Sequence, residues 1–355
     1  MSGYRLLTEP LDSFDRELLG LIQRRVPLVR EPYAQLAVEL GCDERKVLDR
    51  LAVLRAPAGL VREISAIFDA AALGYVQALV AMRVAPEHLE AAGAAVAEHP
   101  GVSHCYGRTG AYDLWFTLAC SPRSRLGLRG TAQALAGRCA AEAHVVLPTL
   151  KRYKLDVRFG AADSASVEDG PSPQRGGRPQ PSPGAPEPAP EQVRAIRALQ
   201  IDLPNRADPF LPLGAEAGMD ADTLLVHAAD FLAAGWMRRY GAVLRHRAAG
   251  ARANLLVAWR VEPAAADAGG AKCARLPAVS HCYLRPTSPD WPYNLYTMIH
   301  GRNREDCRMT VREIVATTQL REHVELWTVK EYKKERIALF SEEEMRWEHD
   351  IPDPS

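Results

Sequence analysis

The chain has 355 residues, of which 47% are hydrophobic and 25% charged, with 44 basic and 44 acidic side chains. This length exceeds that of one ordinary core, so several domains are expected. The balanced charge gives no reason to expect a nucleic acid or a membrane surface as partner, and no apolar run approaches the ~20 residues that a membrane helix requires.

The N-terminal stretch lacks the basic and apolar pattern of an export signal. The seven cysteines are odd in number and scattered, and they contain no Cys-x-x-Cys pair, so neither a disulfide framework nor a zinc site is expected. The sequence predicts a cytoplasmic protein with reduced thiols and no metal site of its own.

The first part of the chain is predicted to be helical. Apolar residues from Leu11 to Ile22 follow a 3.6-residue period, with Asp12 in the N-cap position. A second helix is expected to end at Gly41, and a third to begin at Asp43. Helix, glycine turn and helix is the layout of a helix-turn-helix domain.

The pattern then changes to short β-rich segments that alternate with helices. Strands are predicted at residues 76–84, 102–106, 112–118 and 144–150, and helices at residues 86–98 and 124–140. We interpret this order as βαββαβ, a ferredoxin-like sandwich in which helices cover one face of an antiparallel sheet.

The second half of the chain repeats the first. A shift of 177 residues superposes Gly41 on Gly218, and the segment 102–106, Val-Ser-His-Cys-Tyr, recurs as 279–283. Other matches keep the same order, apart from a small insertion at residues 287–291. A collinear series of this kind indicates duplication and fusion.

The fold class is therefore α+β: a tandem duplication of a degenerate, winged helix-turn-helix domain and a ferredoxin-like βαββαβ sandwich. Between the copies, a Gly-, Pro- and Ser-rich stretch predicts a disordered linker. The predicted segments are helix-turn-helix domain 1 (1–62), sandwich 1 (63–158), linker (159–191), helix-turn-helix domain 2 (192–243), sandwich 2 (244–340) and a loosely attached acidic tail (341–355).

These pieces in this order resemble the Lrp/AsnC family, whose members join a helix-turn-helix to a ferredoxin-like ligand domain. The family phrase appears here as Gly59-Leu60-Val61, Ile67-Phe68-Asp69 and Leu73-Gly74-Tyr75. More specific segments are similar to the siroheme decarboxylase branch: residues 238–247, Ala253-Asn254, Trp259, the two Ser-His-Cys-Tyr segments, Asn294-Leu295-Tyr296 and His300-Gly301-Arg302.

The resemblance implies a carboxy-lyase that removes the C12 and C18 acetate carboxyl groups of siroheme. The product would be 12,18-didecarboxysiroheme, used in the synthesis of haem d1 or haem. It also implies that no cofactor is required, because iron enters with the substrate, and that the fused halves form a pseudo-dimer, with further homo-oligomers left open. The alternatives are a tetrapyrrole-sensing transcriptional regulator and a non-catalytic tetrapyrrole carrier.

A DNA-binding regulator needs cationic side chains on its recognition helix. The third helix of the second copy, expected within residues 220–234, carries three aspartates and no Lys or Arg, and that of the first copy is about neutral. We therefore expect no DNA partner, with the helical domains kept for packing and pairing.

Siroheme bears eight carboxylates, so its pocket should be apolar on the faces and cationic at the rim. A basic cluster in copy two has no counterpart in copy one, where the aligned stretch is Asp69-Ala70-Ala71. We therefore expect a working pocket around copy two. The predicted substrate-binding residues are Arg108, Arg238, Arg239, Arg245, Arg247, Arg252, Arg285, His300, Lys151, Lys330 and Lys333.

Decarboxylation also needs an acid that supplies a proton to the new methyl group. Because side chains alternate along a strand, His104, Tyr106 and Arg108 should lie on one face, as should His281, Tyr283 and Arg285. We predict His104, His281, Tyr106 and Tyr283 as catalytic residues. His246 and His300 are competing acids, and either could instead bind the iron. Trp115 and Trp259 are expected to fill the core rather than stack on the ring.

Overall fold

The structure is a computed structural model that describes residues 11–57, 59–155, 187–245, 253–318 and 320–351. Three predicted site residues, His246, Arg247 and Arg252, lie outside these ranges. The chain forms two compact units, one of residues 1–73 and 186–247 and the other of residues 74–185 and 248–355. Each unit thus combines equivalent parts of the two copies. In the described part, no helix has the length and hydropathy needed to cross a membrane.

The first unit holds both sets of three helices, and two of these helices begin directly after the predicted N-caps Asp12 and Asp43. Asp12 forms a reciprocal capping box with Asp15, and the carboxylates of Asp43 and Asp220 accept backbone N–H bonds at the starts of their helices. The helices are α1 (Ser13–Arg24), α2 (Pro32–Glu39), α3 (Glu44–Arg55), α6 (Pro190–Leu199), α7 (Phe210–Ala217) and α8 (Ala221–Ala233).

Two strands belong to this helical unit. β1 (Val61–Phe68) pairs antiparallel with β7 (Met237–Leu244), so each copy contributes one strand to a shared ribbon. The sequence analysis placed most of β1 in the first sandwich. The structure instead ends the helical unit at Leu73 in copy one and at Arg247 in copy two.

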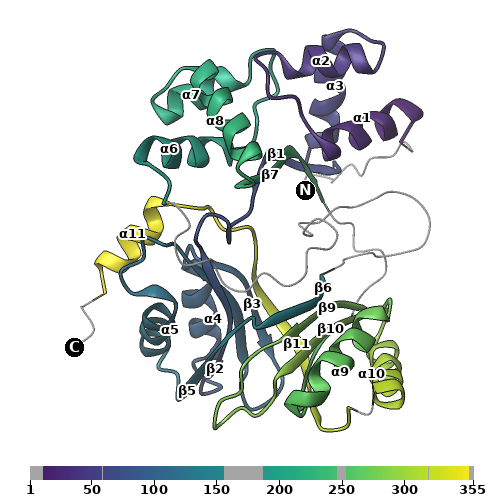
Figure 1. Ribbon diagram of the computed structural model, residues 1–355, viewed down its shortest axis with the longest axis vertical. Coiled ribbons are helices and arrows are strands. Elements are labelled where there is room, and N and C mark those ends of the chain that lie inside the picture. Colours follow the sequence, from purple (N-terminus) through teal and green to yellow (C-terminus); the bar gives the residue numbers. More distant parts are fainter. Residues whose placement is uncertain (1–10, 58, 156–186, 246–252, 319, 352–355) are drawn as a thin grey trace, which may run out of the picture. The chain divides into compact units, whose positions relative to one another are not determined.

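The second unit contains both sandwiches (Figure 1). Among the described residues its strands form one nine-stranded antiparallel sheet, in the order β5-β2-β4-β3-β11-β8-β10-β9-β6. The strands are β2 (Val76–Arg83), β3 (Val102–Arg108), β4 (Leu114–Cys120), β5 (Ala143–Pro148), β6 (Lys151–Leu155), β8 (Ala253–Trp259), β9 (Val279–Leu284), β10 (Leu295–Gly301) and β11 (His323–Lys334).

Helices cover each half of this sheet. The first half carries α4 (Leu89–Glu98) and α5 (Gly127–Arg138), and the second carries α9 (Pro263–Arg275) and α10 (Arg304–Thr318). Each pair packs on its own strands over a separate apolar core. The expected sandwich of antiparallel strands with helices on one face is therefore present in both halves.

The two halves also share a third core. The faces of the strands that are turned away from the helices pack together through aromatic side chains such as Tyr112, Trp115, Trp291 and Tyr296. Trp115 and Trp259 are buried in cores, as predicted, and Trp291 shows that the insertion at residues 287–291 supplies an anchor for this shared core. We call the strand faces on this side the inner faces.

The halves exchange their last strands. The first part of β11 pairs with β8 of its own half, whereas the part from Thr328 to Lys334 pairs with β3 of the other half. β5 and β6 repeat this arrangement, because β5 pairs with β2 and β6 pairs with β9.

Each exchanged strand is fixed on its outer side by the same device. On β11, the Tyr332 ring sits so close to Gly93 of α4 that a Cβ there would lie 2.4 Å from it. On β6, Tyr153 sits equally close to Gly270 of α9, and its hydroxyl donates to Asp267 at 2.5 Å. We call this contact the tyrosine-glycine lock, and glycine is required in it because any side chain would fill the space of the ring.

The C-terminal segment differs from the prediction of a loose tail. Residues of α11 (Glu342–His349) dock on the first half, where the Trp347 ring lies 4.3 Å from that of His99. The Glu344 carboxylate accepts the Ser121 N–H at 2.9 Å, and burial raises the pKa of this carboxyl group. A sequence rich in acidic residues looks solvated, but here two of the acids cap the backbone that leads into α5.

Candidate functional site

The predicted His-Tyr-Arg row exists on the inner face of both halves. Cys105 points into the core under the helices, so its neighbours His104, Tyr106 and Arg108 point the other way. The centroids of the His104 and Tyr106 rings are 6.2 Å apart, and the Arg108 guanidinium lies 5.1 Å from the Tyr106 ring.

The row on β9 repeats this geometry closely. The His281 and Tyr283 rings are 6.1 Å apart, and the Arg285 guanidinium lies 5.1 Å from the Tyr283 ring. Cys282 is again in the helix-facing core. Two equivalent rows of imidazole, phenol and guanidinium therefore line the inner faces.

The two arginines of these rows are buried cations with unused donors. Arg108 Nη1 donates to the Leu326 carbonyl at 3.1 Å, and Arg285 Nη1 donates to the equivalent Leu147 carbonyl at 2.5 Å. The Nε atom of each has no hydrogen-bond partner among the described residues. Burial lowers the pKa of Arg108 to about 10 and also lowers that of Arg285. Both groups would gain from an anionic acceptor.

The histidines of the rows are neutral in this environment. Burial lowers the pKa of His104 to about 4, with a further contribution from the charge of Lys334. His281 is lowered to about 4 by burial and then by the nearby His300 and His104. The three imidazoles therefore occupy one region of the inner faces, although they come from three strands.

A hydroxyl group holds each row histidine at its Nδ1 atom. Ser103 Oγ lies 3.0 Å from Nδ1 of His104, and Ser280 Oγ lies 2.7 Å from Nδ1 of His281. The Ser280 Oγ also lies 3.3 Å from the Met298 carbonyl, and when its single proton is donated there, Nδ1 of His281 is the donor in the Ser-His pair. Nε2 of His281 then carries the lone pair that can take up a proton.

His300, predicted as a substrate-binding residue, lies on the inner face of β10 and is aligned with Asn254 on β8. Burial lowers the pKa of His300 to about 4, followed by the charges of Lys334 and Arg108. The Oδ1 atom of Asn254 is buried without a hydrogen-bond partner among the described residues. Asn254 belongs to the Ala253-Asn254 segment of the family resemblance but was not predicted as a site residue, because a single asparagine in an apolar strand gives no chemical signal on its own.

Three of the predicted arginines lie in the other unit, where they bind protein groups. Arg238 pairs with Asp69 at 3.3 Å, and Arg239 donates to the Gln23 carbonyl. Nη1 of Arg245 lies within bonding distance of three backbone carbonyls, with the Val61 carbonyl at 2.9 Å. In the described part of the chain these guanidinium groups hold the β1-β7 ribbon to its surroundings, and the pocket expected around this cluster stays a prediction.

The predicted lysines also point away from the rows. Lys151 pairs with Asp267 at 2.7 Å and Lys330 with Glu90, in each case beside a tyrosine-glycine lock. Lys333 donates to the carbonyl of His99 at 3.1 Å. These lysines therefore bind protein groups on the helix side of the exchanged strands and do not face the rows.

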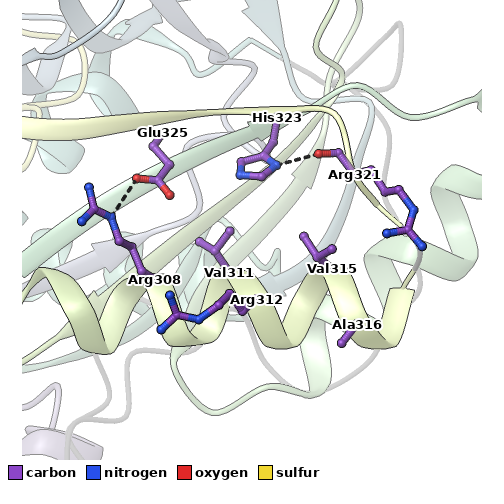
Figure 2. A pocket seen from close by; sticks show the side chains of 8 residues that line it. All are labelled: Arg308, Val311, Arg312, Val315, Ala316, Arg321, His323 and Glu325. Carbon is purple, nitrogen blue, oxygen red and sulfur yellow. Dashed lines mark hydrogen bonds and ion pairs between the residues drawn. The ribbon is translucent and has the colours of Figure 1, made fainter.

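A surface groove elsewhere does not contribute to the rows. Figure 2 shows it between α10 and β11, with a volume of about 360 Å³. Arg308 reaches Glu325 at 3.6 Å within this groove, and Nδ1 of His323 donates to the Arg321 carbonyl at 2.9 Å. The groove lies on the helix side of the sheet, so it is separate from the inner faces.

Comparisons with known proteins agree with the duplicated organisation. Residues 72–154 and 248–333 match the AsnC-like ligand binding domain, and residues 15–62 match the siroheme decarboxylase NirDL-like HTH domain. A siroheme decarboxylase of Hydrogenobacter thermophilus is 34% identical over 95% of this chain and 97% of its own length.

Two further relatives bear on the architecture. A siroheme decarboxylase beta subunit of Desulfovibrio desulfuricans is 40% identical, matching 43% of this chain and 97% of its own length. The crystal structure of the siroheme decarboxylase NirDL with an iron-uroporphyrin III analogue is 31% identical, with a TM-score of 0.76, and covers 94% of this chain and 97% of that one. With the fold, the duplicated rows and these near full-length matches together, the chain belongs to the siroheme decarboxylase family.

Proposed function

We propose that this chain is a carboxy-lyase that converts siroheme to 12,18-didecarboxysiroheme by removing the carboxyl groups of the C12 and C18 acetates. The product would serve the synthesis of haem d1 or haem, and the reaction would take place in the cytoplasm. Iron would arrive as part of the substrate, and no further cofactor is proposed. The family membership supports this proposal, and the paired His-Tyr-Arg rows are the observation that carries it.

The rows offer what a macrocycle with many carboxylates needs. Arg108 and Arg285 are buried cations with unused Nε donors, and a carboxylate would satisfy both the charge and the donor. The neighbouring Tyr106 and Tyr283 rings present flat apolar surface beside these cations. Each half can therefore hold a carboxylate next to a histidine.

The chemical step breaks the bond between an acetate methylene carbon and its carboxylate carbon. Carbon dioxide leaves, and the electron pair of that bond stays on the methylene carbon, where the conjugated macrocycle delocalises it. One proton then completes the methyl group. The protein must exclude water from the departing carboxylate and supply this proton, and we assign the second task to His104 and His281.

Substrate binding would itself favour protonation of the two row histidines. Burial, followed by Lys334 for His104 and by His300 and His104 for His281, holds both pKa values at about 4, so both imidazoles are neutral near pH 7. Carboxylates placed beside the imidazoles favour the protonated form and raise these pKa values. The proton that enters the product is therefore taken up together with the substrate.

The helical unit is not proposed to read DNA. α8 carries Asp222 in its first turn and has no Lys or Arg. In α3, Arg45 is 3.7 Å from Asp49, and Arg50 is paired with the buried Asp15. These cations are therefore partly neutralised by the protein, which leaves little positive charge for a phosphate backbone.

The decisive test is anaerobic incubation of the purified protein with siroheme, followed by mass spectrometry of the pigment. We expect loss of two carboxyl groups as carbon dioxide, with the macrocycle and its iron unchanged. Binding without loss of mass would instead indicate a carrier. Binding of pigment combined with tight, sequence-dependent retention of DNA on a filter would indicate a regulator.

A further inference from the structure

The two rows have equivalent geometry, but the residues facing them across the exchanged strands differ. On β11, Lys334 is aligned with His104, and on β6 the equivalent position aligned with His281 is Leu155. One histidine therefore has a cationic neighbour on the next strand and the other has an aliphatic one.

The directions of these side chains follow from their neighbours in the strands. Lys333 is aligned with Cys105 and donates to the carbonyl of His99 on the helix side, so Lys334 must point to the inner face. On β6, Lys154 donates to the Leu276 carbonyl in the same way, which places Leu155 on the inner face. Lys334 also contributes to the lowered pKa of His104, after burial.

A second pair of unlike residues lies beside the tyrosines. Glu331 is aligned with Tyr106, and the equivalent residue aligned with Tyr283 is Arg152. Burial first, and then the charge of Glu331, raises the pKa of Tyr106 to about 12. The cation thus lies beside the histidine in one row and beside the tyrosine in the other.

The two rows also differ in a residue on the neighbouring strand, which is β4 for the His104 row and β10 for the His281 row. His300 on β10 lies near Lys334, and the repeat places Ala119 of β4 at its equivalent position. Lys334 therefore lies beside His104 with Ala119 on the next strand, whereas His281 has Leu155 on one side and His300 on the next strand. A macrocycle without twofold symmetry would not bind equally well in the two orientations that related halves allow.

We propose that Lys334 and Arg152 each bind a peripheral carboxylate of the pigment and that Glu331 repels one, so that the macrocycle is held in one of two pseudo-symmetric orientations. This inference rests on the proposed function, because it assigns the residues that orient the substrate of that site. It predicts that one acetate is placed beside a histidine first, so the first decarboxylation yields mainly one of the two possible mono-decarboxylated isomers.

The test exchanges residues between equivalent positions. In the variant K334L, affinity for iron-uroporphyrin III should fall about tenfold, the effect of losing one charge-assisted hydrogen bond. The preference between the two mono-decarboxylated isomers of siroheme in a single turnover should also decrease. In the fourfold exchange K334L/L155K/E331R/R152E, the charged groups are all kept but their positions are swapped, so the other isomer should predominate.

K330L is the matched control. It also replaces a β11 lysine with leucine, but Lys330 points outward to Glu90, so affinity and isomer ratio should stay as in the unaltered protein. The inference is overturned if K334L matches K330L in both measurements, or if a folded fourfold variant yields the original isomer. If the unaltered protein fails to decarboxylate siroheme, the proposed function fails, and the pigment affinities of K334L and K330L still decide whether Lys334 binds a carboxylate.

Discussion

Several single residues on the inner faces are buried and yet carry a charged or titratable side chain. Arg108 and Arg285 are buried and charged, and each keeps an unused Nε donor. His104 and His281 are buried and neutral, with Nδ1 held by a serine. A buried cation and a neutral imidazole are both unstable choices for a simple core, which is why we assign them to a ligand rather than to packing.

The role of the histidines is tested by the double variant H104A/H281A. It removes both proposed acids but leaves both arginines, so we expect folding and siroheme binding to be largely retained. Loss of carbon dioxide should fall by at least 100-fold, the usual contribution of a general acid. Single-turnover analysis of the pigment measures this rate, and turnover at the original rate would exclude these residues from the mechanism.

Stability should depend on pH because the fold keeps His99, His104, His281 and His300 from being protonated. Each has a pKa of about 4 in the folded chain, below the ordinary value near 6.5 that applies when the chain is unfolded. The unfolded chain therefore binds more protons between pH 6.5 and 4, so stability is complete above pH 6.5 and is lost as the pH falls through this window.

Urea unfolding at several pH values measures this effect. Each histidine contributes at most about 1.4 kcal/mol per pH unit to the slope of the unfolding free energy. H104Q/H281Q should reduce the slope between pH 6.5 and 4, whereas H349Q, at a side chain that is 91% exposed, should not. An identical slope in both variants would contradict the assignment of buried, neutral imidazoles.

At the scale of elements, the exchanged strands β6 and β11 determine how the two rows are brought together. Each strand leaves its own half and pairs with the row strand of the other half, β9 or β3. Its outward residues form the tyrosine-glycine lock, and its inward residues face the row. The outward residues of each exchanged strand therefore join the two halves, and the inward residues of the same strand differ between the rows.

Substitution of the lock glycines tests this fastening. In G270A the new Cβ would lie 2.4 Å from the Tyr153 ring, so the ring must move, and overpacking of this kind costs about 1–3 kcal/mol. G137A is the control, since its Cβ would meet nothing within 4 Å on α5, and it should stabilise the helix by about 0.5–1 kcal/mol. Thermal unfolding should separate the two variants, and equal midpoints would argue against a tight contact at Gly270.

At the scale of the molecule, each compact unit is built from both copies. β1 needs β7 as partner, and β3 needs the end of β11. Neither half of the chain can satisfy these strand edges alone, and unpaired edges promote association. The duplication therefore gives one folded protein and not two independent domains in series.

This leads to a prediction for the separated halves. Residues 1–158 and 187–355, expressed alone, should aggregate or form homodimers through their open edges, whereas together they should form a 1:1 complex. Light scattering after size-exclusion chromatography measures the masses. A well-folded monomer of either half would contradict the dependence of each unit on both copies.

The sequence by itself determined the local elements and the duplication. The helix starts at Asp12 and Asp43 follow from capping, which depends on a few adjacent residues. The direction of His104 and Tyr106 follows from the alternation of side chains in a strand, which is equally local. The role of the cluster at Arg245 does not follow from the sequence, because basic composition does not reveal whether a guanidinium binds backbone carbonyls, as Arg245 does here, or a ligand.

Only the tertiary structure decided which strands pair across the copies. Pairing between β3 and β11 joins residues more than two hundred positions apart, and no short-range pattern encodes such a contact. That pairing brings Lys334 to His104 and Leu155 to His281, while it turns Lys330 and Lys333 outward. Long-range register, which depends on the packing of the whole unit, therefore selected the residues that face the site.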